Sequence, residues 1–239
     1  MKPGDSVASI YLDGTYAAKN SSFGDDNAAW KAASVRRMLA AQGWSAARVC
    51  EIGCGGGGIL VELAKHLPDT QFTGYEPMPE AYAVCRTRAG GRLEFLHESP
   101  AGKVLEKPFD VALCLDVFEH VEDYMGFLRS LRGLARHFIF HIPLDMNAQM
   151  VFRLEPIVRV RREVGHLHYF CRETALATLR DTGYVVDRWF YTDSSTSSYA
   201  NWKFRLMKLP RKVLFALAPD FTVRVLGGYP LMVAATPGT

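Results

Sequence analysis

Residues 51–58 read EIGCGGGG, a glutamate and an isoleucine followed by six residues of which five are glycine. Two spacings that are typical of nucleotide-binding turns overlap in this stretch. The GxGxxG spacing falls on Gly53, Gly55 and Gly58. The ExGxGxG spacing falls on Glu51, Gly53, Gly55 and Gly57. The glycine run alone therefore predicts a nucleotide-binding turn and leaves its ligand open.

The glycine run lies between a predicted strand and a predicted helix. The short apolar run ARVCEIG at 47–53 is typical of a buried parallel strand. The segment after the glycines places Ile59, Leu60, Leu63 and Leu67 on one helical face before Pro68. Glycines at such a turn allow close backbone approach to a ligand, and they expose amide groups at the helix N-terminus. This arrangement fits a phosphate or a sulfonium ligand alike.

The rest of the chain alternates strand and helix patterns. We expect further strands at 71–77, 92–99, 109–117, 137–144, 184–192 and 229–236. We expect a first helix that begins at residues 25–27, runs to Leu39 and is closed by Gly43. Further helices are expected from Pro79 to Gly90, across 124–131 and, after a long irregular stretch, across 172–183. Strands separated by helices favour a doubly wound, mostly parallel sheet of the α/β class, covered on both faces.

A chain of 239 residues suits a single α/β domain. Within it we expect an N-terminal lid and helix at 1–45 and a nucleotide-binding core at 46–192. A basic, aromatic segment at 193–222 predicts an insertion that covers the substrate, and 223–239 holds the last strand.

The composition argues against several other classes of protein. A net charge of +3 is too weak to predict nucleic-acid binding by itself. The N-terminus has no apolar signal-peptide core, and no stretch approaches the about 18 uncharged apolar residues that a spanning helix needs. The five cysteines contain no CxxC pair, which argues against disulfides and structural zinc. We therefore expect a cytoplasmic protein without a transmembrane segment, and the sequence leaves its oligomeric state open.

Two acidic residues bear on the choice of ligand. Glu76 ends the second strand, where a carboxylate can bind two ribose hydroxyls, and this fits both NAD and S-adenosylmethionine. Glu51 would oppose a pyrophosphate, but it could help to hold the α-ammonium group of a methionine moiety. The sequence DVFEHVED at the end of the fourth strand is the third feature at this edge of the sheet.

Three motifs, EIGCGGGG, GYEP and FDVALCLDVFEHV, in this order and spacing resemble the class I S-adenosylmethionine-dependent methyltransferases. The resemblance covers roughly residues 47–192. It implies a Rossmann-like methyltransferase fold, which is a seven-stranded sheet whose last strand is antiparallel. YPLMVAAT would be that strand, paired with YVVDRWFYT.

The resemblance also implies a set of residues that bind S-adenosylmethionine. Glycine-run residues would line the methionine part, Glu76 would bind the ribose, and two residues after the third strand would contact the adenine. Tyr11, Tyr16 and Trp30 resemble an aromatic N-terminal lid, with packing of the first helix as the alternative. The full predicted set is Glu51, Gly53, Cys54, Gly55, Gly57, Glu76, Glu98, Ser99, Asp116, Val117 and Tyr16.

Histidines are the candidates for a general base. His120, His166 and His168 are the predicted catalytic residues, and each could instead be a hydrogen-bonded packing residue. If the chain turns helical at Asp116, then Asp116, Glu119 and His120 share one face and could bind a divalent metal. His166 and His168 could complete this site. This arrangement is similar to the ExxEH metal site of ubiquinone-pathway O-methyltransferases and of small-RNA 2′-O-methyltransferases, with aspartate in place of the first glutamate. A metal-free site is the preferred hypothesis.

We therefore predict methyl transfer from S-adenosylmethionine to a hydroxyl or amino group of a small molecule. The motif NPPY is absent after the fourth strand, which disfavours a nucleobase amino group. The alternatives are an RNA 2′-O-methyltransferase and a non-catalytic S-adenosylmethionine-binding partner subunit, with an NAD-dependent oxidoreductase third. Two basic stretches could attract an anionic substrate, an acidic carrier protein or an anionic membrane, or they are scattered solvated charge. They contain Arg153, Arg159, Arg161, Arg162, Lys203, Arg205, Lys208, Arg211 and Lys212.

Overall fold

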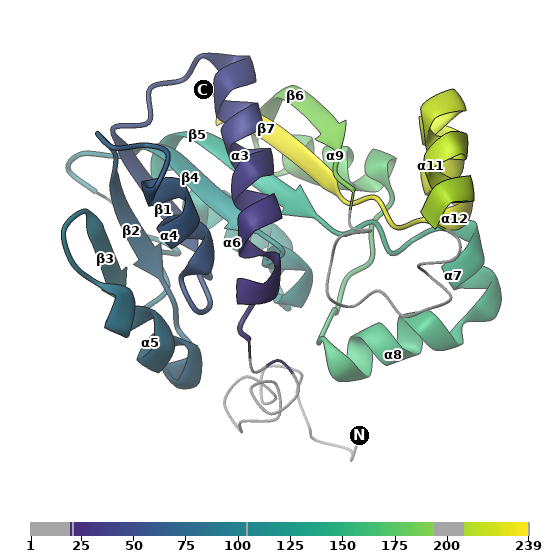
Figure 1. Ribbon diagram of the computed structural model, residues 1–239, viewed down its shortest axis with the longest axis horizontal. Helices are drawn as coiled ribbons and strands as arrows, with labels where there is room; N and C mark the ends of the chain where they lie inside the picture. The colour runs from purple at the N-terminus through teal and green to yellow at the C-terminus, as the bar shows by residue number, and fades with distance from the viewer. Residues whose placement is uncertain (1–19, 21, 104, 194–207, 239) are drawn as a thin grey trace.

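The computed structural model describes residues 20, 22–103, 105–193 and 208–238 (Figure 1). Tyr11 and Tyr16, and with them most of the predicted aromatic lid, lie outside the described residues. None of the helices within the described ranges has the length and apolar character needed to cross a membrane.

A seven-stranded sheet forms the centre of the fold, with the order β3-β2-β1-β4-β5-β7-β6. Pairing is parallel except at β7, which runs antiparallel to both β5 and β6. The predicted sheet, including the antiparallel last strand paired with 184–192, is confirmed. The strands are β1 Arg48–Ile52, β2 Gln71–Tyr75, β3 Leu93–Leu96, β4 Phe109–Leu115, β5 Ala135–Ile142, β6 Tyr184–Tyr191 and β7 Leu231–Pro237.

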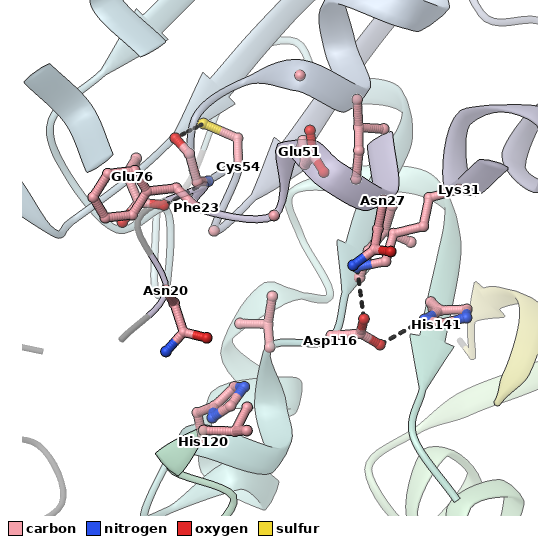
Figure 2. Close-up of a pocket in the computed structure, with 18 of the residues that line it drawn as sticks. Asn20, Phe23, Asn27, Lys31, Glu51, Cys54, Glu76, Asp116, His120 and His141 are labelled. Atoms are coloured by element: carbon pink, nitrogen blue, oxygen red, sulfur yellow. Dashed lines mark hydrogen bonds and ion pairs between the residues drawn. The ribbon is translucent and has the colours of Figure 1, made fainter. Parts of the chain in front are cut away.

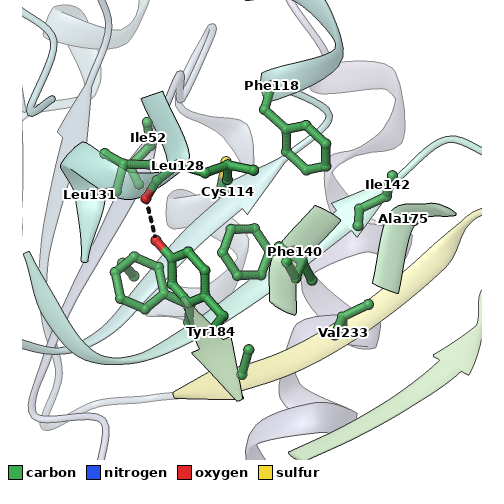
Figure 3. Close-up of a cluster of buried hydrophobic side chains, with 14 of the residues drawn as sticks. Ile52, Cys114, Phe118, Leu128, Leu131, Phe140, Ile142, Ala175, Tyr184 and Val233 are labelled. Carbon is green, nitrogen blue, oxygen red and sulfur yellow. Dashed lines mark hydrogen bonds between the residues drawn. The ribbon is translucent and has the colours of Figure 1, made fainter. Parts of the chain in front are cut away.

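Helices cover both faces of the sheet, because neighbouring residues of each strand point to opposite sides. In β4, Ala112 and Cys114 face one apolar cluster, and Val111 and Leu113 face the other. Figure 1 shows α3 and α4 in front of the sheet, and Figure 3 shows part of the cluster behind it, where the Tyr184 hydroxyl donates to the Leu128 carbonyl at 2.8 Å. The covering helices are α3 Ala28–Gln42, α4 Gly58–Ala64, α5 Pro79–Cys85, α6 Tyr124–Leu131 and α9 Arg172–Asp181.

Two helix ends follow directly from local chemistry. Gly43 closes α3 in the left-handed conformation (φ 65°), and its N–H donates to the Leu39 carbonyl at 3.0 Å. Pro79 opens α5, where its missing N–H leaves no hydrogen bond unmade. Both ends were predicted and are confirmed.

Four helices gather at one end of the molecule, at the right of Figure 1. They are α7 Ala148–Arg153, α8 Glu155–Glu163, α11 Lys208–Leu217 and α12 Pro219–Leu226. The prediction of a long irregular stretch before residue 172 is wrong, because α7 and α8 lie in it. The boundary at 223 is also wrong, because α12 runs to Leu226 before the last strand begins.

Candidate functional site

A cavity of about 700 Å³ lies beyond the carboxyl ends of β1, β2, β4 and β5 (Figure 2). Residues that follow each of these strands line it, together with the segment from Asn20 to Lys31. This is the edge at which doubly wound sheets bind their ligands. The predicted site residues found in the lining are Glu51, Gly53, Cys54, Gly55, Glu76, Asp116, Val117, His120 and His166.

The backbone amides of the glycine run are hydrogen bonded inside the protein. The prediction that they are exposed to a ligand at the helix N-terminus is therefore wrong. Their acceptors are the Tyr75 carbonyl for Gly53 (2.8 Å) and Cys54 (3.1 Å), Glu76 Oε2 for Gly55 (2.7 Å), the Phe23 carbonyl for Gly56 (3.1 Å), the Cys54 carbonyl for Gly57 (2.9 Å) and Asp25 Oδ1 for Gly58 (3.1 Å).

Asp25 occupies the position at which a phosphate would bind. Its carboxylate accepts the Gly58 amide at the start of α4, and Arg88 holds it with two hydrogen bonds of 3.0 and 2.6 Å. A helix N-terminus attracts anions, but here a side chain already supplies the negative charge. The turn is therefore unsuited to a pyrophosphate, and the sequence alone did not reveal this because Asp25 lies 33 residues from Gly58.

Close packing explains why glycine is required at two positions of the run. Gly55 has φ 54°, and an added Cβ would collide with the Phe23 carbonyl oxygen. Gly57 has φ 81°, and an added Cβ would lie 2.7 Å from the Phe95 ring. Only glycine adopts these angles without strain, so the run lets the segment around Phe23 close over the turn.

Glu51 and Glu76 are buried carboxyls of the cavity wall. Glu76 accepts amide hydrogen bonds from Gly55 at 2.7 Å and Met78 at 2.8 Å, and burial raises its pKa. Glu51 is 2% exposed, and its Oε2 has no hydrogen-bond partner among the described residues. Burial raises the pKa of Glu51 to about 8, although the nearby Lys31 opposes the shift.

We expect the variant Glu51→Gln to gain stability relative to the wild type as the pH rises. The Glu51 pKa rises from 4.5 to about 8 on folding, so between these values the native state holds a proton that the unfolded state has lost. Wild-type stability therefore falls across this window by a few kcal/mol, since each pKa unit corresponds to about 1.4 kcal/mol.

Thermal melting at pH 5 and pH 8.5 measures this effect. The melting temperature of the variant minus that of the wild type should rise by roughly 5 °C or more between the two pH values. Glu62→Gln, on the neighbouring helix α4, is the matched control and should show no such rise. A difference for Glu51→Gln that stays constant with pH would contradict the raised pKa.

Lys31, Asp116 and His141 form a charged network beside Glu51 (Figure 2). Lys31 Nζ lies 2.7 Å from Asp116 Oδ2, and His141 Nδ1 lies 2.5 Å from Asp116 Oδ1. Burial alone would raise the pKa of Asp116, but His141 and Lys31 outweigh it and lower that pKa well below its usual range. Asp116 is therefore ionised and held by two partners.

The backbone at Asp116 rules out the predicted metal site on one helical face. Asp116 has φ 57°, and the helical turn that follows it is the short 3-10 segment Phe118–His120, which does not include Asp116. The carboxylate of Asp116 contacts Lys31 and His141 instead. The prediction that Asp116, Glu119 and His120 form one face is wrong.

Three other members of the predicted metal set could hold a metal ion without Asp116. Atoms of Glu119, His120 and His166 all lie within 4.8 Å of one another. Both carboxylate oxygens of Glu119 are buried without a hydrogen-bond partner among the described residues, and burial raises the Glu119 pKa to about 8. Burial also lowers the His120 pKa to about 3, so this imidazole is neutral, as a metal ligand must be.

His166 is oriented by an acidic partner. Its Nδ1 lies 2.6 Å from Asp145 Oδ2. Burial disfavours the charged imidazole, but Asp145 outweighs it and raises the pKa of His166. A proton on Nδ1 leaves Nε2 as the reactive nitrogen.

The other predicted site residues lie outside the cavity lining or outside the described residues. Glu98 pairs with Lys103, and the Ser99 hydroxyl accepts the Ala101 amide at 3.3 Å. The His168 ring lies against Tyr124, and its Nε2 lies 2.9 Å from the Val121 carbonyl. Gly57 packs behind the turn, and Tyr16 lies in the part of the chain that is not described.

Sequence reasoning missed Lys31 and His141. Lys31 lies on the otherwise apolar stripe of α3 with Ala28 and Val35, and a lysine on such a stripe is the signal that could have drawn attention to it. His141 lies in the apolar run of β5 and has no comparable signal. Trp30 lines the cavity, with its ring edge-on to that of His141 at 5.5 Å.

A family model for a methyltransferase domain matches residues 26–188, which is more than half of the chain. The chain belongs to this family. The methyltransferase is 39% identical over 94 residues to the mitochondrial ubiquinone biosynthesis O-methyltransferase of Schizosaccharomyces pombe. That match covers 37% of this chain and 34% of the relative, so it spans about a third of the relative's length.

Two further comparisons agree with the family. The methyltransferase is 32% identical over 160 residues to the ubiquinone biosynthesis O-methyltransferase of Aliivibrio fischeri strain MJ11, covering 62% of this chain and 68% of that protein. Its fold resembles magnesium protoporphyrin IX methyltransferase from Synechocystis PCC 6803 with bound SAH, at 19% identity and a TM-score of 0.58 over 87% of this chain and 82% of the other. The methyltransferase family that the sequence predicted is confirmed, and the seven-stranded sheet agrees with the Rossmann-like fold that the resemblance implied.

Proposed function

We propose that this methyltransferase transfers the methyl group of S-adenosylmethionine to a hydroxyl oxygen of a small, largely apolar acceptor. The observation that carries the proposal is the pair His166–Asp145, joined at 2.6 Å, with His166 in the wall of the cavity. Matches to two proteins named O-methyltransferases support oxygen as the acceptor atom. A cytoplasmic location belongs to the same proposal, and the five free thiols support it.

The residues around the glycine turn fit the cofactor. Glu76 would accept hydrogen bonds from the ribose hydroxyls, because each of its oxygens has a lone pair beyond the one that binds an amide. Glu51 Oε2, which has no hydrogen-bond partner among the described residues, would accept a hydrogen bond from the ammonium group of the methionine part. Backbone atoms of Gly53, Cys54 and Gly55 would lie along the same part. When bound, the cofactor supplies a methyl group that its sulfonium has already activated for displacement.

The apolar part of the cavity lining suits an apolar acceptor. Trp30, Pro143, Val164 and Pro230 belong to the lining, as do His120 and His166. A hydroxyl oxygen that gains a methyl group must lose its proton, and a positioned base lowers the barrier to that loss. His166 Nε2 would take the proton, while Asp145 holds Nδ1–H and stabilises the charge that develops on the ring.

A divalent cation is the second candidate for activating the hydroxyl. The oxygens of Glu119 favour it, because they have no hydrogen-bond partner among the described residues and a buried carboxylate is stabilised by a cation. Glu119, His120 and His166 supply one carboxylate and two imidazoles, which is a common donor set for divalent transition metals. Such a cation would lower the pKa of an acceptor hydroxyl, and Asp145 would then orient His166 from behind.

Chelation separates these two candidates. If a cation is needed, EDTA followed by desalting should lower kcat at least tenfold to a hundredfold, and Mn²⁺ or Mg²⁺ should restore it. Glu119→Gln should then show the same loss, without rescue by metal. If His166 acts as the base, methyl transfer should be unchanged after chelation. The rate of label transfer from methyl-labelled S-adenosylmethionine is the measurement.

The acceptor class is tested with the same labelled donor. Panels of phenols and alcohols, amines, and RNA oligonucleotides are offered to the purified protein. We expect label in the hydroxyl panel as an ether. Label at RNA 2′-hydroxyls with strongly salt-dependent binding would favour the RNA alternative. Cofactor binding without transfer to any panel would favour the non-catalytic partner subunit, and label on nitrogen would contradict hydroxyl transfer.

A further inference from the structure

Exposed large apolar side chains gather on the four helices at one end of the molecule. Phe152 is 92% exposed and Leu217 is 79% exposed. Aromatic and leucine side chains with this exposure are unusual on the surface of a monomeric protein unless the surface binds something. The exposed apolar residues on these helices and their junctions are Val151, Phe152, Leu154, Val158, Leu209, Val213, Leu214, Leu217 and Phe221.

These helices are joined into one structure. Helix α11 packs on α12, α12 on α7, and α7 on α8, and Figure 1 shows them together at one end of the sheet. The side chain of Asn147 lies against Gly227, where α12 ends, and leaves no room there for a Cβ. Leu154, with φ 56°, forms the sharp junction between α7 and α8. The fold itself therefore presents these apolar side chains to the outside.

Basic residues accompany the apolar ones. The segment 148–163 carries four arginines and two glutamates. Arg153 and Arg159 are exposed. Lys212 on α11 is exposed as well, and its Nζ lies 3.4 Å from Asp193 Oδ2. On α12 the acidic Asp220 is paired with Arg172 at 2.5 Å, so it adds little negative potential. Amphipathic helices with outward apolar residues and a basic flank are typical of proteins that lie on anionic membranes.

Residues next to the same helices line the cavity. Val164 directly follows α8, and Pro143 lies between β5 and α7. Pro230 lies between α12 and β7. An apolar acceptor that leaves a lipid bilayer at this surface would therefore have a short path into the cavity.

We propose that α7, α8, α11 and α12 form a docking surface for an anionic phospholipid bilayer, with Phe152 and Leu217 entering the apolar layer. A second copy of the chain fits the surface less well, because a two-fold contact would bring the arginines of both copies together. Anionic lipid headgroups neutralise those arginines. Vesicle binding needs no turnover, so this proposal and the proposed hydroxyl transfer can fail independently.

Vesicle co-sedimentation tests the proposal. Vesicles of phosphatidylcholine alone are compared with vesicles containing 30% phosphatidylglycerol as the probe. We expect binding to the anionic vesicles that weakens with added salt, and much weaker binding to the neutral ones. The double variant Phe152→Ser/Leu217→Ser should lower the affinity at least a hundredfold. Arg153→Glu/Arg159→Glu should remove most of the salt-dependent part of the binding.

Val185→Ser is the matched control, because Val185 is 57% exposed but lies on β6. It should bind vesicles as the wild type does. All variants should still bind S-adenosylhomocysteine, which shows that they are folded. Absence of wild-type binding to anionic vesicles at low salt, or an equal loss in Val185→Ser, would overturn the proposal. A dimer of the wild type in sedimentation equilibrium would also overturn the proposal if only Phe152→Ser/Leu217→Ser dissociates it and the wild type does not bind vesicles.

Discussion

Replacing Glu76 by alanine is expected to weaken binding of S-adenosylmethionine at least a hundredfold. Two ribose hydroxyls would lose a charged acceptor, and hydrogen bonds to charged groups contribute about 1.5–3 kcal/mol each. The Gly55 and Met78 amides, now held by Glu76 at 2.7 and 2.8 Å, would lose their acceptor as well. A loss of about 3 kcal/mol corresponds to more than a hundredfold in Kd. Calorimetric titration measures it.

The matched control is Glu62→Ala. Glu62 lies on α4 close to the same turn, and its carboxylate pairs with Lys65 at 2.5 Å at the surface. This variant should bind the cofactor as the wild type does. If Glu76→Ala binds within threefold of the wild type while it remains folded, the assignment of Glu76 to the ribose is wrong.

Replacing His166 by alanine is expected to lower kcat by roughly 10²–10⁴ without changing the Kd of the cofactor. A positioned base contributes this much to a proton transfer, and His166 lines the cavity. Asp145→Asn should lower kcat at least tenfold, because the amide no longer fixes the proton on Nδ1 or stabilises the charged ring. Single-turnover label transfer with saturating cofactor measures both variants.

His168→Ala is the control for this prediction. His168 lies two residues away, but its ring contacts Tyr124 and the Val121 carbonyl, outside the cavity lining. Its kcat should stay within about threefold of the wild type, because it has no position from which to take a proton. An equal loss in His168→Ala, or full activity in His166→Ala, would contradict the assignment of the base.

The central sheet was predictable because its signals are local and agree with one another. The apolar runs predicted the order of strands and helices, and Gly43 and Pro79 marked two helix ends. The resemblance to class I methyltransferases predicted that the last strand is antiparallel. The helices α7 and α8 were not predicted, because several of their apolar residues face outward and leave no stripe directed at a core. A helix can be predicted from the spacing of its apolar residues only when those residues face the core.

The site residues at the ends of strands could be predicted from the sequence, whereas their contacts with residues of distant elements could not. Glu51 and Glu76 line the cavity, and each belongs to one of the three motifs of the resemblance. His166 lines the cavity as well, although none of these motifs contains it. The partners Asp25 and Lys31 come from the N-terminal segment, far along the chain from the groups they contact. Asp116 departs from the expected helical turn because Lys31 and His141 hold its carboxylate on another side.

A crystal structure of the protein with S-adenosylhomocysteine tests the central assignment most directly. We expect the ribose hydroxyls within hydrogen-bonding distance of Glu76, and the ammonium group beside Glu51. We also expect the sulfur to face the end of the cavity where His166 lies. Density for the ligand outside this cavity, or a ribose that contacts neither oxygen of Glu76, would contradict the site described for this methyltransferase.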